Sequence, residues 1–485
     1  MPDLYQELSK LADSDYYPFH MPGHKRNVES TPMKGAFRCD ITEIDDFDNL
    51  HDASGIIQEA QNRAGKLYGC KETFFLVNGS TCGILTALSA AFKEGDTILA
   101  ARGCHKAFYH GAYLRHINIE YLPYKLNERY GIPESYTGED IEKALSDGIK
   151  GVFITSPTYE GRCSDIGKIA QICHRRNIPL IVDAAHGAHF GFGNNVDGSG
   201  SDCEYEKLPE NAIKLGADVV IHSVHKTLPS MTQTALLHCQ GNTVDVDRIR
   251  RYLRIYQSSS PSYVLMASID LCIKEMEQEG TEFVRTLLEY RNHIQNAVRN
   301  CKNLEVLGKN VVDDAAKVCI YVKNGTMTGQ KLYDILREEY HLQLEMAGDR
   351  HVLAIISGWD TLEGIDRLIN AIIDIDSKIG IEGDASECIS DNTKDGVIEY
   401  QLPKRVIGLN EAWDSDREVI SFDEALGHVS GEFVNLYPPG IPLVVPGEEI
   451  NSDIVRSVAK YLDENMNVQG IVNGDRKGFI CVKQK

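Results

Sequence analysis

A lysine that directly follows an apolar run is the residue of this sequence best placed for covalent chemistry. Lys226 closes the tetrapeptide Ser223-Val224-His225-Lys226, which begins at the end of the apolar run DVVIHS (218–223). A lysine at the end of a buried strand is partly desolvated, which lowers the pKa of its ammonium and makes the amine a usable nucleophile. The alternative is a solvated surface lysine, which the neighbouring apolar run disfavours.

Two further apolar runs end in residues suited to binding an anion and a cation. The run TFFLV (73–77) is followed by Ser80 and Thr81 at the start of a helical pattern. Hydroxyls and free N–H groups at a helix N-terminus bind phosphate, although a simple helix cap has the same appearance in sequence. Asp183 ends the run PLIVD (179–183), where a buried carboxylate needs a cationic partner or serves only to cap the next turn.

These features together match the needs of pyridoxal 5'-phosphate (PLP). That cofactor requires a lysine for its aldehyde carbon, a carboxylate beside its pyridinium nitrogen and an anion-binding site for its phosphate. Lys226, Asp183 and the pair Ser80 and Thr81 are the candidates for these tasks. A metal site has little support, because the histidines at 186 and 189 have no third ligand nearby in the sequence.

The elements that must position these residues alternate regularly between residues 73 and 238. Short apolar runs, continuous rather than alternating, are separated by amphipathic stretches of helix length, as expected for strands buried on both faces. The runs lie at 73–77, 97–100, 119–122, 151–155, 179–183, 218–223 and 234–238. This pattern predicts an α/β fold with a mainly parallel, seven-stranded sheet, whose ligands bind beyond the carboxyl ends of the strands.

Changes in pattern along the chain predict five segments. Strand candidates at 317–322 and 351–357 flank helical runs and indicate a smaller α+β domain, and a polar, acidic stretch follows it. The predicted segments are an N-terminal arm (1–60), a large domain (61–280), a small α+β domain (281–380), an acidic linker (381–400) and a C-terminal α+β domain (401–485).

Composition excludes several classes of protein. The 485 residues are 42% hydrophobic, too many for a disordered chain. The 50 basic and 71 acidic residues give a net charge of −21, which argues against binding to nucleic acid or anionic membranes and suits a basic substrate. No apolar run approaches the roughly 18 residues of a membrane helix, and the first residues do not resemble a signal peptide. The 13 cysteines include no Cys-x-x-Cys pair and indicate free thiols, so we expect a cytoplasmic protein.

The chain resembles the prokaryotic ornithine/lysine/arginine decarboxylase family, in particular its shorter forms without an N-terminal receiver-like domain. This resemblance implies a PLP enzyme of fold type I, the aspartate aminotransferase-like fold, and it covers almost the whole chain. Nine motifs carry it, in order: PFHMPGHKR (18–26), DITEIDDFDNLHDASG (40–55), FFLVNGSTCG (74–83), CHKAFYHG (104–111), SPTYEG (156–161), VDAAHGAHFG (182–191), HSVHKTLPSMTQTALLH (222–238), QSSSPSYVLMASID (257–270) and YPPGIPLVVPGEE (437–449).

The resemblance implies a role for each matching residue. Lys226 is expected to bind PLP covalently, Asp183 to pair with the ring nitrogen, and His105 to stack on the ring. Ser80, Thr81, Ser223 and His186 are expected at the cofactor, and His225 beside the reacting carbons. Ser258 and Ser259 are expected to reach the phosphate of a partner protomer, and Glu432 to contact the cation of the substrate. A shared site of this kind implies a homodimer or a higher homo-oligomer.

The expected activity is decarboxylation of a basic L-amino acid to an amine and CO2, with arginine the first choice, lysine the second and ornithine the third. Departures from the family pattern concern the substrate pocket: Ala184 replaces a common glutamate, Gly103 a common asparagine, and the polar stretch 193–201 follows the aspartate motif. Two alternatives stay open. One is another fold type I activity, such as an aminotransferase or a lyase, and the other is a catalytically silent paralogue that regulates a true decarboxylase.

Overall fold

The computed structural model describes residues 3–27, 31–193, 203–323, 327–379, 397–436, 441–463, 466–472 and 477–483. A seven-stranded sheet lies at its centre, with the order β1 (Glu72–Leu76), β8 (Ala235–Cys239), β7 (Val219–Ser223), β6 (Leu180–Asp183), β5 (Ile149–Thr155), β2 (Thr97–Ala100) and β3 (Asn118–Tyr121). The strand β8 runs in one direction, and the other six strands run in the opposite direction, parallel to one another. Every strand lies within two residues of its predicted position, so the predicted fold class is confirmed.

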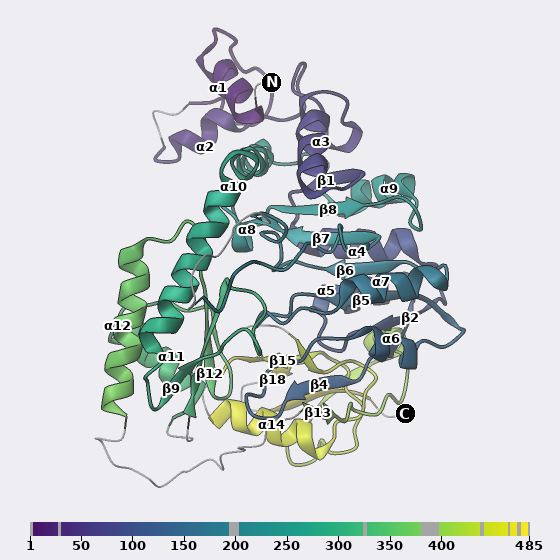
Figure 1. Ribbon diagram of the computed structural model, residues 1–485. Coiled ribbons are helices and arrows are strands. Elements are labelled where there is room, and N and C mark those ends of the chain that lie inside the picture. Colours follow the sequence, from purple (N-terminus) through teal and green to yellow (C-terminus); the bar gives the residue numbers. More distant parts are fainter. Residues whose placement is uncertain are drawn as a thin grey trace.

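Helices cover both faces of this sheet (Figure 1). Those that follow its strands are α4 (Gly79–Ala91), α5 (Lys106–Arg115), α6 (Gly138–Ala144), α7 (Ile166–Arg175), α8 (Val224–Thr227) and α9 (Val246–Tyr256). The helix α4 packs against the sheet at residue 83, a glycine, where there is no room for a side chain. A Cβ atom there would lie 2.7 Å from Cδ1 of Leu76 and 3.1 Å from Cγ2 of Ile221.

The 36-residue helix α10 (Tyr263–Val298) leads from the large sheet to a second, four-stranded sheet (Figure 1). The order of that sheet is β11 (Met346–Ala347), β12 (His351–Ile355), β10 (Lys317–Val322) and β9 (Leu304–Val306). It is accompanied by α11 (Gly329–Glu338) and by α12 (Leu362–Lys378), which packs along α10. The N-terminal elements α1 (Leu4–Asp13), α2 (Lys34–Cys39), η1 (Leu50–Asp52) and α3 (Ile56–Tyr68) lie near the other end of α10.

The C-terminal part contains two small antiparallel sheets that pack on their own apolar core. One has the order β14 (Arg417–Ser421), β19 (Gly478–Val482), β18 (Ile471–Val472), and the other β16 (Pro442–Val444), β15 (Val434–Leu436), β17 (Val468–Gln469). The helices are α13 (Leu409–Asp414) and α14 (Ser452–Asp463).

The predicted linker (381–400) lies outside the described residues except for its last four. Those form β13 (Val397–Tyr400), which pairs with β4 (Tyr124–Asn127) beside the large sheet. The polar stretch 193–201 lies outside the described residues after Gly193, as do residues 437–440 of the proline-rich motif. The predicted segment boundaries therefore stay predictions.

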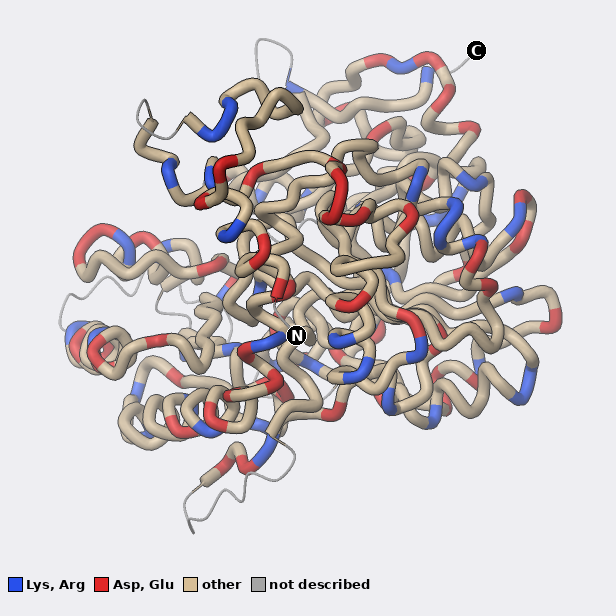
Figure 2. The backbone as a smooth tube through the Cα atoms, turned by 90° about the horizontal axis from the view of Figure 1, so that it is seen from above, with Lys and Arg blue, Asp and Glu red and all other residues tan. Residues whose placement is uncertain are grey.

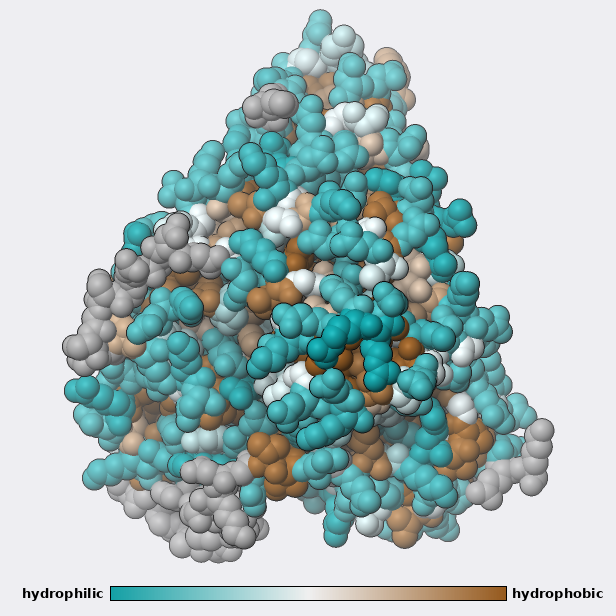
Figure 3. Space-filling model, turned by 45° about the vertical axis from the view of Figure 1, so that its right-hand side comes forward, coloured by the Kyte–Doolittle hydropathy of each residue, from teal (hydrophilic) through white to brown (hydrophobic). Residues whose placement is uncertain are grey.

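The surface is mixed in character. Acidic and basic residues are interspersed along the backbone in Figure 2, and the face in Figure 3 is mostly hydrophilic with apolar side chains in separate small groups. No helix within the described ranges is long and apolar enough to span a membrane.

Candidate active site

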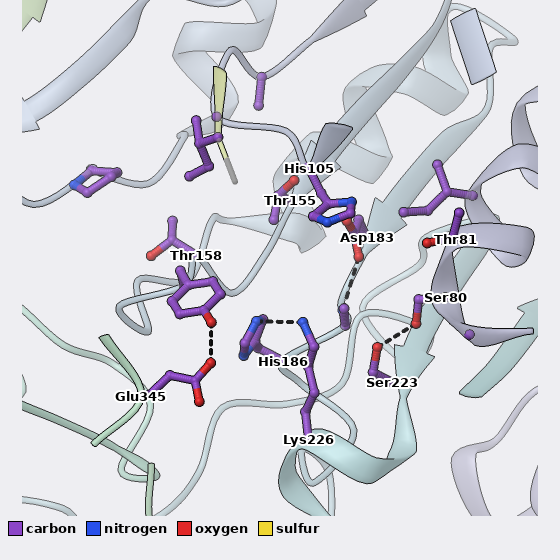
Figure 4. Close-up of a pocket in the computed structure, with 18 of the residues that line it drawn as sticks. Ser80, Thr81, His105, Thr155, Thr158, Asp183, His186, Ser223, Lys226 and Glu345 are labelled. Atoms are coloured by element: carbon purple, nitrogen blue, oxygen red, sulfur yellow. Dashed lines mark hydrogen bonds between the residues drawn. The ribbon is translucent and has the colours of Figure 1, made fainter. Parts of the chain in front are cut away.

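A cavity of about 390 Å³ opens at the carboxyl ends of the central parallel strands. Much of its polar lining comes from loops after different strands of the large sheet, as expected for an open α/β sheet, and Glu134 and Glu345 add to it from elsewhere in the chain. Its lining residues include Ser80 after β1, His105 after β2, Thr155, Thr158 and Tyr159 at and after β5, Asp183, Ala185 and His186 at and after β6, and Ser223, His225 and Lys226 at and after β7. In Figure 4 the side chains of Lys226 and His186 point toward each other, as do those of Ser80 and Ser223.

Lys226 extends into the cavity from the single-turn helix α8. Its Nζ atom lies 2.9 Å from Nε2 of His186. Burial lowers the pKa of this lysine, and the negative charges of Asp183 and Glu345 act against that lowering. A desolvated lysine beside an imidazole can act as an amine nucleophile, because a lower pKa leaves more of the reactive neutral form.

Asp183 lies at the end of β6, in the middle of the sheet, and is only 3% exposed. Its Oδ1 accepts a hydrogen bond of 3.1 Å from the backbone N–H of Ala185. Burial raises the pKa of this carboxyl, and Lys226 opposes the change. In the described part of the chain Asp183 has no ion-pair partner, so this carboxylate suits a bound group that presents a cationic N–H.

The N-terminus of α4 forms an anion-binding surface on another wall of the cavity. Ser80 Oγ lies 2.6 Å from Ser223 Oγ, which brings together hydroxyls from the ends of two strands (Figure 4). The side chain of the N-cap residue Asn78 makes no hydrogen bond to the helix. The N–H of Gly79 donates to the carbonyl oxygen of Gln233 at 3.0 Å, and the next N–H groups of α4, those of Ser80 and Thr81, have no acceptor within the helix. The side chain of Thr81 lies beside them, and together these groups can bind a phosphate.

Three histidines line the cavity, and two of them, His105 and His225, are neutral groups held by backbone contacts. His105 caps α5, with Nδ1 accepting the backbone N–H of Ala107 at 3.2 Å, and burial lowers its pKa to about 4. His225 Nδ1 lies 2.8 Å from the carbonyl oxygen of Thr234, to which it must donate because a carbonyl only accepts. Burial lowers the pKa of His225 as well, which leaves Nε2 as an unprotonated base.

Three predicted site residues do not line this cavity. The backbone N–H of Ser258 donates to Asn78 Oδ1 at 3.2 Å, which places the loop with Ser259 beside the start of α4 but outside the cavity. Glu432 pairs with Arg417 at 3.2 Å and accepts the backbone N–H of Phe433. The charge of Glu432 is therefore compensated locally, and the roles expected of these three residues stay predictions.

Several residues in or beside the cavity were not predicted from the sequence, among them Glu345, Lys317 and Tyr159. Glu345 lines it next to β11, and its carboxylate accepts a hydrogen bond from the hydroxyl of Tyr159 (Figure 4). Lys317, at the start of β10, lies 2.7 Å from Nδ1 of His186. Tyr159 belongs to a quoted motif, SPTYEG, but Glu345 and Lys317 carry no local signal of a site.

Comparison with known proteins agrees with this geometry. Residues 2–356 match the family model described as the Orn/Lys/Arg decarboxylase major domain. The chain belongs to the Orn/Lys/Arg decarboxylase family. Residues 402–472 match the C-terminal domain of the same family.

Similar proteins align with this chain over most of its length. The arginine decarboxylase of Bacillus subtilis (strain 168) is 30% identical over 96% of this chain and 95% of the relative. The lysine decarboxylase LdcA of Pseudomonas aeruginosa is 23% identical over 96% of this chain and 76% of the relative. Among solved structures, the Francisella novicida lysine decarboxylase LdcF superimposes with a TM-score of 0.80 at 18% identity, covering 100% of this chain and 81% of that chain, which confirms the expected fold.

Proposed function

We propose that this family member is a PLP-dependent decarboxylase of a basic L-amino acid, with arginine as first substrate, lysine as second and ornithine as third. The products would be agmatine, cadaverine or putrescine, each with CO2. The observation that carries this proposal is the meeting of Lys226, Asp183 and the N-terminus of α4 in one cavity. The order of substrates rests on the relatives from Bacillus subtilis and Bacillus anthracis that bear the name arginine decarboxylase.

The residues of the cavity fit PLP group by group. Lys226 would hold the aldehyde carbon, and Asp183, buried without an ion-pair partner in the described chain, would hold the pyridine nitrogen. Ser80, Thr81 and Ser223 would hold the phosphate at the start of α4. His105 would cover one face of the ring, and His186 lies within hydrogen-bond distance of Lys226.

When bound, PLP accepts the electrons that remain on the substrate after the carboxylate leaves. Asp183 would support this by keeping a proton on the ring nitrogen, since a buried carboxylate stabilises an adjacent cation. The neutral ring of His105 adds no charge of its own to the cavity. A proton must then reach the α-carbon of the substrate. Lys226 Nζ, or His225 Nε2 once it has taken up a proton from solvent, would deliver it, because both groups line the cavity and a lowered pKa makes each protonated form a stronger acid.

The charge of the cavity supports a cationic substrate. Glu134 and Glu345 both line it. Glu134 is compensated by Arg162 at 3.1 Å, whereas Glu345 has no ion-pair partner within the described ranges. A guanidinium can bind a carboxylate through two hydrogen bonds and an ammonium as a point charge, so either basic side chain has a partner here.

The proposal extends to assembly and location. The loop of Ser258 and Ser259 would complete the phosphate site of a partner protomer, and Glu432 would face the substrate cation, in a homodimer or higher homo-oligomer. Size-exclusion chromatography with light scattering tests the assembly, and a monomer would contradict it.

The enzyme would act in the cytoplasm, in polyamine biosynthesis or amino-acid catabolism, without nucleic-acid or membrane partners.

Product analysis tests the proposed reaction. The purified, PLP-loaded protein is incubated separately with arginine, lysine and ornithine, and amine, CO2 and keto acid are quantified. We expect amine and CO2 in equal amounts, with arginine the best substrate. A keto acid without CO2 would favour an aminotransferase, and a protein that takes up no PLP and converts none of the three would favour a silent paralogue.

A further inference from the structure

Lys317 is a buried lysine beside the cavity for which the proposed reaction has no task. It opens β10 in the second sheet, and none of its surface is exposed. No carboxylate lies within ion-pair distance of its Nζ atom in the described part of the chain, and its hydrogen-bond partner is Nδ1 of His186 at 2.7 Å. Burying a lysine in this way is costly, so its position calls for an explanation.

Lys317, His186 and Lys226 form a row. The two lysine nitrogens contact opposite nitrogens of one imidazole, Lys317 at Nδ1 and Lys226 at Nε2, at 2.7 and 2.9 Å. The ring of Tyr159 lies against all three side chains, with centroid distances of 4.6 Å to the His186 ring, 5.9 Å to Nζ of Lys226 and 5.7 Å to Nζ of Lys317. Figure 4 shows the contact between His186 and Lys226 inside the cavity.

The number of protons in this row is limited. Burial holds the pKa of His186 well below its ordinary value, so the ring is neutral. A neutral imidazole has one donating and one accepting nitrogen, whereas a lysine ammonium only donates. The two lysines therefore cannot both donate to His186. With both contacts formed, one lysine nitrogen is a neutral amine that accepts the ring proton, and the other donates to the unprotonated ring nitrogen.

The surrounding groups indicate which lysine keeps the charge. The titratable groups that face Lys317 are Asp314, Glu160, Glu345 and Cys319. The groups that face Lys226 are Asp183, Glu345 and His105. His189 faces His186. Asp314 favours an ammonium on Lys317, and although burial lowers the pKa of Lys317 to about 8, this still leaves it charged at neutral pH. Asp183, the carboxylate that favours a charge on Lys226, is the group that PLP would engage.

We propose that Lys317 is a positioning residue that acts on Lys226 through His186. The ammonium of Lys317 donates a hydrogen bond to Nδ1 of His186, so the ring proton lies on Nε2. From Nε2 this proton points at the nitrogen of Lys226. A hydrogen bond donated to the neutral form of that nitrogen, together with the nearby positive charge, opposes its protonation. This keeps the nitrogen of Lys226 available as a nucleophile and base. The inference rests on the proposed PLP chemistry of this cavity.

The pH titration of the visible absorbance of the PLP-loaded enzyme tests this role without substrate. That absorbance reports protonation of the nitrogen that joins Lys226 to the cofactor. Lys317→Met keeps an unbranched apolar side chain and removes the charge. A unit charge at about 8 Å, the span of one imidazole and two hydrogen bonds, at an effective dielectric constant of about 20, changes a pKa by about 1.5. We expect the midpoint to rise by about that amount in Lys317→Met.

Lys323→Met is the matched control. Lys323 lies just beyond the far end of the same strand, roughly 20 Å along it, and donates to the carbonyl oxygen of Cys301. Its replacement should leave the midpoint unchanged. An unchanged midpoint in Lys317→Met would overturn the role of Lys317 alone, whereas a wild-type protein without any PLP absorbance would overturn the proposed function and this role with it.

A measurement on the wild-type protein covers the case in which Lys317→Met fails to fold or to bind PLP. Nitrogen NMR of the PLP-loaded enzyme with labelled histidines distinguishes protonated from unprotonated ring nitrogens, and the signal of His186 is assigned by its loss in His186→Gln. We expect a protonated Nε2 and an unprotonated Nδ1. A proton on Nδ1 would overturn the proposal, because Lys317 would then be the amine.

Discussion

Arg102 and Glu448 form a buried ion pair that joins the large sheet to the C-terminal part of the chain. The guanidinium of Arg102, just after β2, lies 2.8 Å from Oε2 of Glu448, and the two side chains are 3% and 2% exposed. The same carboxylate oxygen accepts the backbone N–H of Val445, and the same guanidinium nitrogen donates to the carbonyl of Leu443. The pair thereby fixes the segment that follows Ile441, a residue of the cavity wall.

Removing the carboxylate leaves the guanidinium buried without a counter-charge. Breaking a buried ion pair from one side costs about 3–5 kcal/mol, because the remaining charge loses its partner while staying desolvated. Tyr121, whose ring centroid lies 5.0 Å from the guanidinium carbon, offsets a part of this. We therefore expect Glu448→Ala to lower the free energy of unfolding by about 3–5 kcal/mol. Glu448→Gln should cost about 1–3 kcal/mol, since an amide oxygen still accepts both hydrogen bonds.

Urea unfolding followed by tryptophan fluorescence measures this cost in the relevant part of the molecule. Trp413 packs on Phe433 at 4.8 Å between ring centroids, and it reports on the C-terminal part when the other tryptophan, Trp359, is replaced by phenylalanine in every protein compared. Glu449→Ala is the control, because that neighbouring carboxylate makes no ion pair among the described residues and should matter little. Stability of Glu448→Ala within about 0.5 kcal/mol of the Glu449→Ala control would refute the reasoning, because a broken buried pair should cost several times more.

Two further predictions concern the large sheet. Gly83→Ala places a methyl group against Leu76 and Ile221. We therefore expect the free energy of unfolding to fall by about 1–3 kcal/mol and PLP to bind more weakly at the displaced α4. Gly148→Ala is the control, and it should change neither quantity because the space around its Cβ is open. Burial lowers the pKa of His222 to about 3, so its unfolded form binds a proton below about pH 6.5 while its folded form does not, and stability falls as the pH drops through that window. Between pH 7 and pH 5 the free energy of unfolding, measured with urea, should therefore fall by about 2 kcal/mol less in His222→Phe than in the wild type. An equal fall in both proteins would contradict this assignment.

The sequence predicts the large sheet well because parallel strands buried on both faces are continuous apolar runs. Asp183, Ser223 and Lys226 stand at or directly after such runs, so the rule that ligands bind beyond the strand ends was enough to bring them together. His105 and His186 needed the family resemblance, since a histidine after a strand has no distinctive pattern of its own.

The rest of the cavity depends on how the second sheet packs against the first. Lys317 and Glu345 lie more than 90 residues beyond Lys226, and within KVCIYV or LEMAG neither differs from an ordinary polar residue at a strand edge. Only the packing of the two sheets shows that Lys317 reaches His186 and that Glu345 meets Tyr159. Local periodicity contains no information about such long-range contacts.

The central claim is that Lys226 in this cavity carries out PLP-dependent decarboxylation. The most direct measurement is the release of labelled CO2 from carboxyl-labelled arginine by PLP-loaded wild-type protein and by Lys226→Ala, with each protein's visible absorbance recorded. We expect release by the wild type, and loss of both the covalently bound PLP absorbance and nearly all release in the variant. Release at the wild-type rate by Lys226→Ala, or an unaltered absorbance band, would contradict the account.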